Sequence, residues 1–173
     1  VLVFSQQGDR PPTHDISGSD LDGDEYLAVW HPDLVPNQTE NYPPFDYDSD
    51  IPAEDHPGPI DRDVINKKVL DIAKLDCLGL LSKLHLAFAD KFGVNDEKTL
   101  KIAKAVSQEL DSAKTGFHPY TNEAINRLSD KLEKKRPDFF NDPTFESYQS
   151  KEILGKIKYS MSIQVLLNCV YLV

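Results

Sequence analysis

The pattern of hydrophobic and polar positions changes near residue 61 of this 173-residue chain. Before it, short apolar runs alternate with polar and proline-rich loops, and the clearest runs are Val1–Phe4 and Tyr26–Trp30. Such runs, rich in β-branched and aromatic residues, are typical of buried strands. After it, apolar residues recur at three- and four-residue spacing, which predicts helices. The expected fold class is therefore α/β (α+β): a β part over residues 1–36, then a mainly α-helical region over residues 61–160.

Four helices are expected in the second part, over residues 63–91, 97–113, 122–135 and 151–160. Gly93 is a stop signal for the first helix, and Gly79 inside it suggests a kink or a close contact with another helix. Asn95 or Asp96 is expected to cap the second helix. The expected buried side of that second helix consists of Leu100, Ala103, Val106 and Leu110.

Two segments are expected to lie outside these elements. Residues 37–60 are rich in proline and acidic residues, which predicts a linker or a long surface loop. Residues 161–173 form an apolar tail about half as long as a membrane span requires, so no membrane partner is expected. The tail is either a buried segment whose packing partner is missing or a region beyond the natural coding sequence.

The net charge of −10 is unevenly distributed. Residues 1–63 contain 15 acidic and 2 basic residues, whereas residues 64–173 contain 14 acidic and 17 basic residues. An overall negative charge argues against a nucleic-acid partner, but an acidic metal site beside a basic region suits phosphoryl transfer. Cys77 and Cys169 lack metal-ligand spacing and are expected to be thiols in a reducing intracellular compartment, either cytoplasm or nucleus.

The stretch Ser17–Tyr26 places Asp20, Asp22 and Asp24 at alternate positions around Gly23. Three carboxylates so close repel one another, and a divalent cation would cancel that repulsion. An acidic surface turn is one alternative. A calcium loop of the EF-hand type fails, because it requires glycine at position 6 and glutamate at position 12, where a count from Asp20 finds glutamate and histidine. The flanking apolar runs favour a metal site, with the three aspartates as ligands.

The chain then resembles the catalytic signature of the cellular RNA-dependent RNA polymerases of eukaryotic RNA silencing. The similar segments are Gly8–Pro11, Ser17–Asp24, Tyr26–Trp30 and Leu34–Pro36, with weaker similarity at Leu78–Leu86, Ala89–Asp90, Asp111–Gly116 and Arg136–Phe139. The resemblance covers roughly residues 1–158. This sequence departs from the family pattern at His31, Lys83 and Ser112–Ala113, none of which belongs to the Asp-x-Asp-Gly-Asp loop.

The resemblance implies that residues 1–36 are a fragment of a double-psi β-barrel and that Asp20, Asp22 and Asp24 are the catalytic residues that bind Mg²⁺, or Mn²⁺ in its place. It implies an RNA-directed RNA polymerase, which makes complementary or double-stranded RNA for RNA silencing and small interfering RNA production. The implied partners are RNA template and product, ribonucleoside triphosphates, and a missing N-terminal part of the same polymerase. Because the chain opens on Val1, we expect a C-terminal part of the polymerase core that is inactive alone.

Two basic residues are candidates for contacts with RNA or phosphate. Arg10 lies in the loop before the aspartates, and Lys114 lies at the end of the second expected helix. Each has a simpler interpretation, a solvated loop arginine and a lysine stabilised by the helix dipole. His85 and the basic triplet 134–136 are weaker candidates of the same kind. The alternative function is a non-catalytic, truncated polymerase relative that acts as an RNA-binding or interaction module. A calcium-binding acidic module is a third, remote option.

Overall fold

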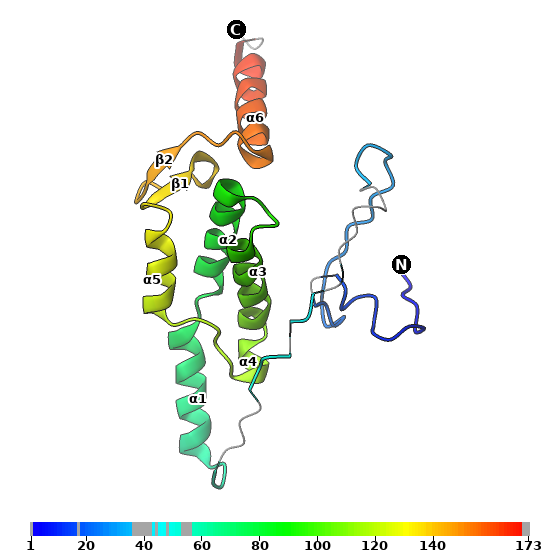
Figure 1. The fold of residues 1–173 in the computed structure, drawn as a ribbon, viewed down its shortest axis with the longest axis vertical. Helices are drawn as coiled ribbons and strands as arrows, with labels where there is room; N and C mark the ends of the chain where they lie inside the picture. Colours follow the sequence, from blue (N-terminus) through cyan, green and yellow to red (C-terminus); the bar gives the residue numbers. More distant parts are fainter. Residues whose placement is uncertain are drawn as a thin grey trace. The chain divides into compact units, whose positions relative to one another are not determined.

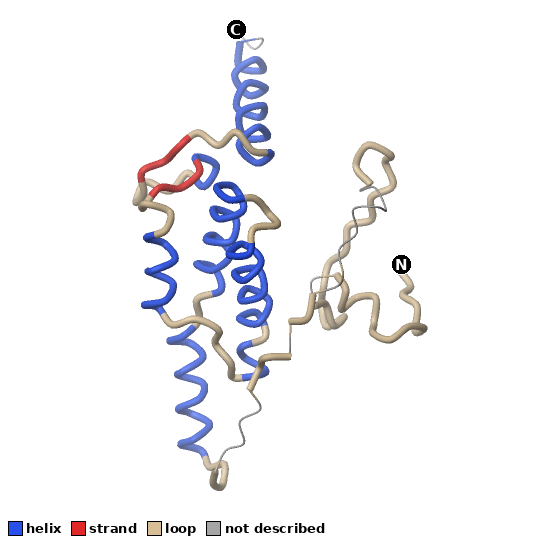
Figure 2. The backbone as a smooth tube through the Cα atoms, in the orientation of Figure 1, coloured by secondary structure: helices blue, strands red, loops and turns tan. Residues whose placement is uncertain are grey.

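The computed structural model describes residues 2–16, 18–35, 43, 45–47, 49–52 and 57–170, with side chains described up to residue 162 in the last helix. The chain divides into two compact units, Val1–Ala53 and Glu54–Val173. Figure 1 shows the path of the chain, and Figure 2 shows that the first unit consists of loops and turns while the second is mainly helical.

The two strands predicted in the first unit are absent from its described residues (Figure 2). Val3 and Leu27 are each 89% exposed, and Trp30 is 84% exposed. A strand is stabilised by pairing with a neighbour and by burial of one face, and the described part of this unit supplies neither. The strand prediction is wrong for this structure, and the double-psi barrel is not formed by the described residues.

The second unit contains six α-helices, a short 3₁₀ helix and a two-stranded sheet within its described residues (Figure 1). The elements are α1 (Arg62–Leu75), α2 (Leu78–Phe92), α3 (Glu97–Leu110), α4 (Ser112–Thr115), α5 (Asn122–Asp130), β1 (Lys135–Pro137), η2 (Asp138–Phe140), β2 (Glu146–Tyr148) and α6 (Ile153–Val170). Strands β1 and β2 pair in parallel, with Arg136 opposite Ser147.

The single helix expected over residues 63–91 is two helices. Asp76 leaves helical geometry, with ψ at 114°, and its Oδ1 accepts a hydrogen bond from the Leu78 backbone N–H. The backbone N–H of Cys77 donates to the buried Glu109 carboxylate instead of continuing the helix. The expected kink at Gly79 is therefore displaced to Asp76. A Cβ on Gly79 would meet nothing within 4 Å, so no close helix contact requires this glycine.

The second expected helix begins as predicted but ends earlier. Of its expected buried side, Val106 is partly buried against the core, but the face that is fully buried is a different one. Asp96 caps α3 by accepting from the Lys98 N–H, and α3 ends at Leu110 before the single turn α4. Leu100 and Leu110 were expected inside, yet they are 37% and 65% exposed. The face that packs on α2 carries Thr99, Ile102, Ala105, Gln108 and Glu109. The apolar spacing alone did not identify this face, because buried polar residues share it.

The third expected helix also ends early. Helix α5 begins at the Thr121 cap and ends at Asp130 rather than at Lys135. Glu133 and Lys134 both have φ at 55°, which is left-handed geometry that breaks a helix. Arg136, expected at a solvated basic helix end, is 5% exposed in β1 and donates to the Ser129 hydroxyl at 2.5 Å.

The last helix continues past its predicted end at Ser160. Helix α6 extends to Val170, because residues 161–170 include neither glycine nor proline. Most of the apolar tail is therefore helical. Among the described residues, no helix combines the length and apolar character that crossing a bilayer requires.

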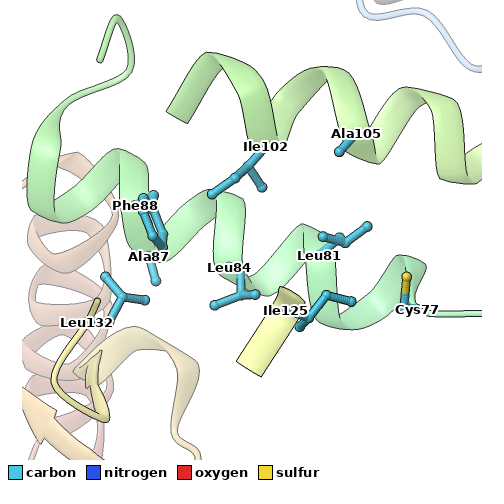
Figure 3. Close-up of a cluster of buried hydrophobic side chains, with 9 residues drawn as sticks. All are labelled: Cys77, Leu81, Leu84, Ala87, Phe88, Ile102, Ala105, Ile125 and Leu132. Atoms are coloured by element: carbon cyan, nitrogen blue, oxygen red, sulfur yellow. The ribbon is translucent and has the colours of Figure 1, made fainter. Parts of the chain in front are cut away.

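The core of the second unit lies between α2, α3 and α5 (Figure 3). Leu81, Leu84 and Phe88 of α2 are fully buried. Helices α3 and α5 contribute Ile102 and Ile125, each only 1% exposed. The nine core residues are Cys77, Leu81, Leu84, Ala87, Phe88, Ile102, Ala105, Ile125 and Leu132. His85 lies half-buried on α2, where burial lowers the pKa of its imidazole. This environment favours a packing role over contact with RNA.

Candidate metal centre

The three aspartates of the loop in the first unit converge. Asp20, Asp22 and Asp24 each offer a carboxylate oxygen within 4.8 Å of the other two. All three side chains are exposed. In the described part of the chain, they are the only group of three or more histidine, cysteine, aspartate or glutamate residues that could hold a metal ion. Carboxylate oxygens are the ligands that hard divalent cations prefer. The donor set therefore fits Mg²⁺ or Mn²⁺, and metal binding itself stays a prediction.

The backbone of the loop explains how alternate residues reach one point. On a regular strand, these side chains would share a face at regular spacing. Here Leu21 has φ at 71° and Gly23 has φ at 143°, so the chain turns twice between the aspartates. The glycine adopts its angle without a Cβ penalty, whereas the leucine is strained. The Asp22 N–H donates to Asp20 Oδ1 at 3.3 Å, which further closes the turn.

The Asp24 carboxylate is held by three hydrogen bonds. Its Oδ2 accepts from the Ser19 hydroxyl at 2.8 Å, from the Leu21 N–H at 3.0 Å and from the Asp20 N–H at 3.3 Å. The Ser19 Oγ also forms a short hydrogen bond with the Tyr26 hydroxyl. Sequence reasoning missed Ser19 and Tyr26. Their positions beside the aspartates were visible, but the conformation that joins them depends on the left-handed Leu21.

Tyr26 connects the loop to the apolar residues of the same unit. Its ring lies 5.0 Å from the ring of Phe4, centroid to centroid. Both rings line a cavity of about 790 Å³ together with Leu2, Leu21 and Pro11. The apolar runs that flank the loop in sequence therefore contact each other beside it, although they do not pair as strands.

Arg10 is engaged within the first unit. Its Nε lies 2.8 Å from Asp15 Oδ1, and its Nη2 donates to the Phe45 carbonyl at 3.2 Å and to His14 Nδ1 over a short distance. These contacts hold the guanidinium within the first unit. A contact between Arg10 and RNA stays a prediction, and it would require an exchange of these partners.

Lys114 belongs to the second unit. Its Nζ lies 3.1 Å from Asp111 Oδ1 at the end of α3, and its side chain is 56% exposed. This i, i+3 pair fits the simpler interpretation of a lysine at a helix end. A contact between Lys114 and phosphate also stays a prediction.

An exposed cluster of three convergent carboxylates can hold a divalent metal ion, and bound metal ions catalyse phosphoryl and nucleotidyl transfer in many proteins. Comparison with known proteins specifies the class further. The profile of the family described as RNA dependent RNA polymerase matches residues 1–161. The chain belongs to this RNA-dependent RNA polymerase family.

Three relatives illustrate the similarity. RNA-dependent RNA polymerase 6 of Arabidopsis thaliana is 33% identical over 168 residues, which cover 90% of this chain and 13% of that protein. RNA-dependent RNA polymerase 1 of the same plant is 33% identical over 160 residues, covering 90% and 14%. RNA-dependent RNA polymerase 1 of Schizosaccharomyces pombe is 33% identical over 171 residues, covering 95% and 14%. The chain thus spans about 13–14% of the length of these relatives.

Proposed function

We propose that this chain supplies the metal-binding catalytic loop of an RNA-directed RNA polymerase. The observation that carries the proposal is the convergence of Asp20, Asp22 and Asp24, with oxygens within 4.8 Å of one another, in a chain of this family. The reaction is nucleotidyl transfer from a ribonucleoside triphosphate to the 3′ end of an RNA strand, directed by an RNA template.

The three aspartates would hold Mg²⁺, with Mn²⁺ as a substitute. When bound, the ion lowers the pKa of the attacking 3′-hydroxyl and stabilises negative charge on the transferring phosphate and the leaving pyrophosphate. The chain's own contribution is to fix the ligands before the substrate arrives. Asp24 is fixed by its three donors, and Asp20 accepts the Asp22 N–H, so the carboxylates are already gathered.

The wider role follows from the family and belongs to the same proposal. The product would be complementary or double-stranded RNA for RNA silencing and small interfering RNA production, in the cytoplasm or the nucleus. Residues 1–63, with 15 acidic and 2 basic residues, offer little positive charge for RNA phosphates. Most phosphate contacts would therefore come from other parts of the polymerase, and the double-psi barrel would form with those parts.

Substitution of the aspartates tests the proposal. In the protein made from the natural reading frame, Asp22→Ala or Asp24→Ala should lower primer extension at least 10²–10³-fold, roughly the effect of losing one strong electrostatic contributor. Asp33→Ala is the matched control, because this exposed aspartate lies in the same unit and, among the described residues, its carboxylate pairs with His31 alone, at 3.9 Å. Near-normal synthesis by Asp22→Ala, or loss of synthesis only through unfolding, would refute the proposed mechanism.

The isolated chain provides a second test. We expect residues 1–173 alone to give no primer extension with Mg²⁺ and ribonucleotides, because positive charge for the RNA phosphates is scarce beside the loop. Synthesis by this chain alone would contradict that expectation. If the protein from the natural reading frame also makes no RNA but binds it, the non-catalytic RNA-binding module becomes the better account.

A further inference from the structure

Ser19 holds one of the proposed metal ligands through a directional chain of hydrogen bonds. A carboxylate accepts hydrogen bonds only, so the single proton of the Ser19 hydroxyl is the one donated to Asp24 Oδ2 at 2.8 Å. The short contact between Ser19 Oγ and the Tyr26 hydroxyl must then have Tyr26 as its donor. The Tyr26 hydroxyl therefore donates to Ser19, and the Ser19 hydroxyl donates to Asp24. Both hydroxyl residues are half-buried, whereas Asp24 is exposed.

The base of this chain is anchored by packing. The Tyr26 ring lies against Phe4 with centroids 5.0 Å apart, so its hydroxyl is held by a ring contact that does not depend on the aspartates. All the donors that the described residues place on Asp24 reach the same oxygen, Oδ2. The other oxygen, Oδ1, remains for a cation. In this arrangement Asp24 would bind a cation through Oδ1 alone.

We propose that Ser19, supported by Tyr26, is a positioning residue that holds Asp24 as a one-oxygen ligand and so favours Mg²⁺ over Ca²⁺ in the aspartate loop. This inference rests on the proposed function, because it assumes that the loop binds a metal. Mg²⁺ requires near-octahedral geometry with short distances, whereas Ca²⁺ accepts two-oxygen carboxylate ligands and higher coordination numbers. A carboxylate with one oxygen held by the protein disfavours the two-oxygen mode.

The test measures metal binding by the full 173-residue chain. Mn²⁺ is the probe, because its free and bound forms differ in their electron paramagnetic resonance signal, and Mg²⁺ and Ca²⁺ are then added as competitors. Residues that hydrogen-bond to metal ligands typically contribute 10–100-fold in affinity, so Ser19→Ala should weaken Mn²⁺ binding about tenfold. It should also reduce the preference for Mg²⁺ over Ca²⁺. A general destabilisation of the fold would instead lower the affinity for all three ions by the same factor.

Three further variants complete the experiment. Ser19→Thr keeps the hydroxyl and should restore both affinity and preference. Tyr26→Phe keeps the ring on Phe4 and removes only the donor, so it should give a smaller shift in the same direction even if Ser19→Ala fails to fold. Ser49→Ala is the matched control, since the described contact of this exposed serine is made by its backbone N–H to Asp46 Oδ1.

The outcomes separate the two levels of the proposal. If the unsubstituted chain binds Mn²⁺ and Asp24→Ala abolishes binding, the metal site stands. Unchanged affinity and preference in both Ser19→Ala and Tyr26→Phe would then overturn the positioning role alone. If the unsubstituted chain binds no Mn²⁺, or Asp24→Ala binds as well as it does, the metal site fails and the positioning role fails with it.

Discussion

Glu109 is the polar side chain of the helical unit whose removal we expect to lower the free energy of unfolding strongly. The side chain is fully buried, and Oε1 accepts from the Cys77 N–H at 3.2 Å and from His118 Nδ1 at 3.1 Å. It therefore connects the start of α2, the end of α3 and the segment before α5. Glu109→Ala leaves the buried Cys77 N–H and the partly buried His118 Nδ1–H without their acceptor, and each such group costs about 1–3 kcal/mol. Two such groups sum to about 2–6 kcal/mol, so we expect a loss in that range.

The assay is urea unfolding of the 173-residue chain, followed by circular dichroism. Against a typical total of about 5–15 kcal/mol, such a loss should move the midpoint strongly. Glu109→Gln keeps a carbonyl acceptor and should lose less. Glu97→Ala is the control on the same helix, where the glutamate is 80% exposed and pairs with Lys101 across the surface, so the midpoint should hardly move. A loss below about 1 kcal/mol for Glu109→Ala would show that the helices are held together without this carboxylate.

Two further predictions concern the same unit. Burial, and then the charge of Glu109, raise the pKa of the Cys77 thiol from 9.0 to about 12. The folded chain keeps this proton to a higher pH than the unfolded chain. The contribution of the protonated thiol to the free energy of unfolding is therefore complete below pH 9 and is lost as the pH rises towards 12. Urea midpoints should fall over this range, and they should fall less steeply in Cys77→Ala. Leu84→Ala, at a fully buried position, should cost about 2–5 kcal/mol in urea unfolding, whereas Leu86→Ala, 39% exposed, should cost well under half as much; equal losses would contradict the core assignment.

The features that the sequence predicted well are local. The cap at Asp96 and the stop at Gly93 depend on residues a few positions apart, and so does the crowding of carboxylates around Gly23. Each of these follows from the chemistry of a short stretch. The family resemblance was local too, and the family profile confirms it over residues 1–161.

The features that failed depend on partners distant in sequence. The break at Asp76 is stabilised by Glu109, a residue 33 positions later, and no pattern within residues 63–91 indicates it. The buried face of α3 includes Glu109 because Cys77 and His118 satisfy its carboxylate. The strands expected at Val1–Phe4 and Tyr26–Trp30 had the right composition, but composition does not supply a neighbouring strand. An apolar run of this composition forms a strand only where such a partner is present.

The two units also separate function from stability. The proposed ligand Asp24 is held by Ser19 and by backbone groups of its own loop, whereas Glu109 and the core between α2, α3 and α5 hold the helices. Each unit therefore has its own stabilising contacts. Removing an aspartate relieves repulsion among neighbouring carboxylates without taking a partner from the helical core. This division predicts a pair of results. Asp22→Ala should lose RNA synthesis with unchanged unfolding, and Glu109→Ala should lose stability. An Asp22→Ala chain whose helices unfold would show that the loop stabilises the helical unit after all.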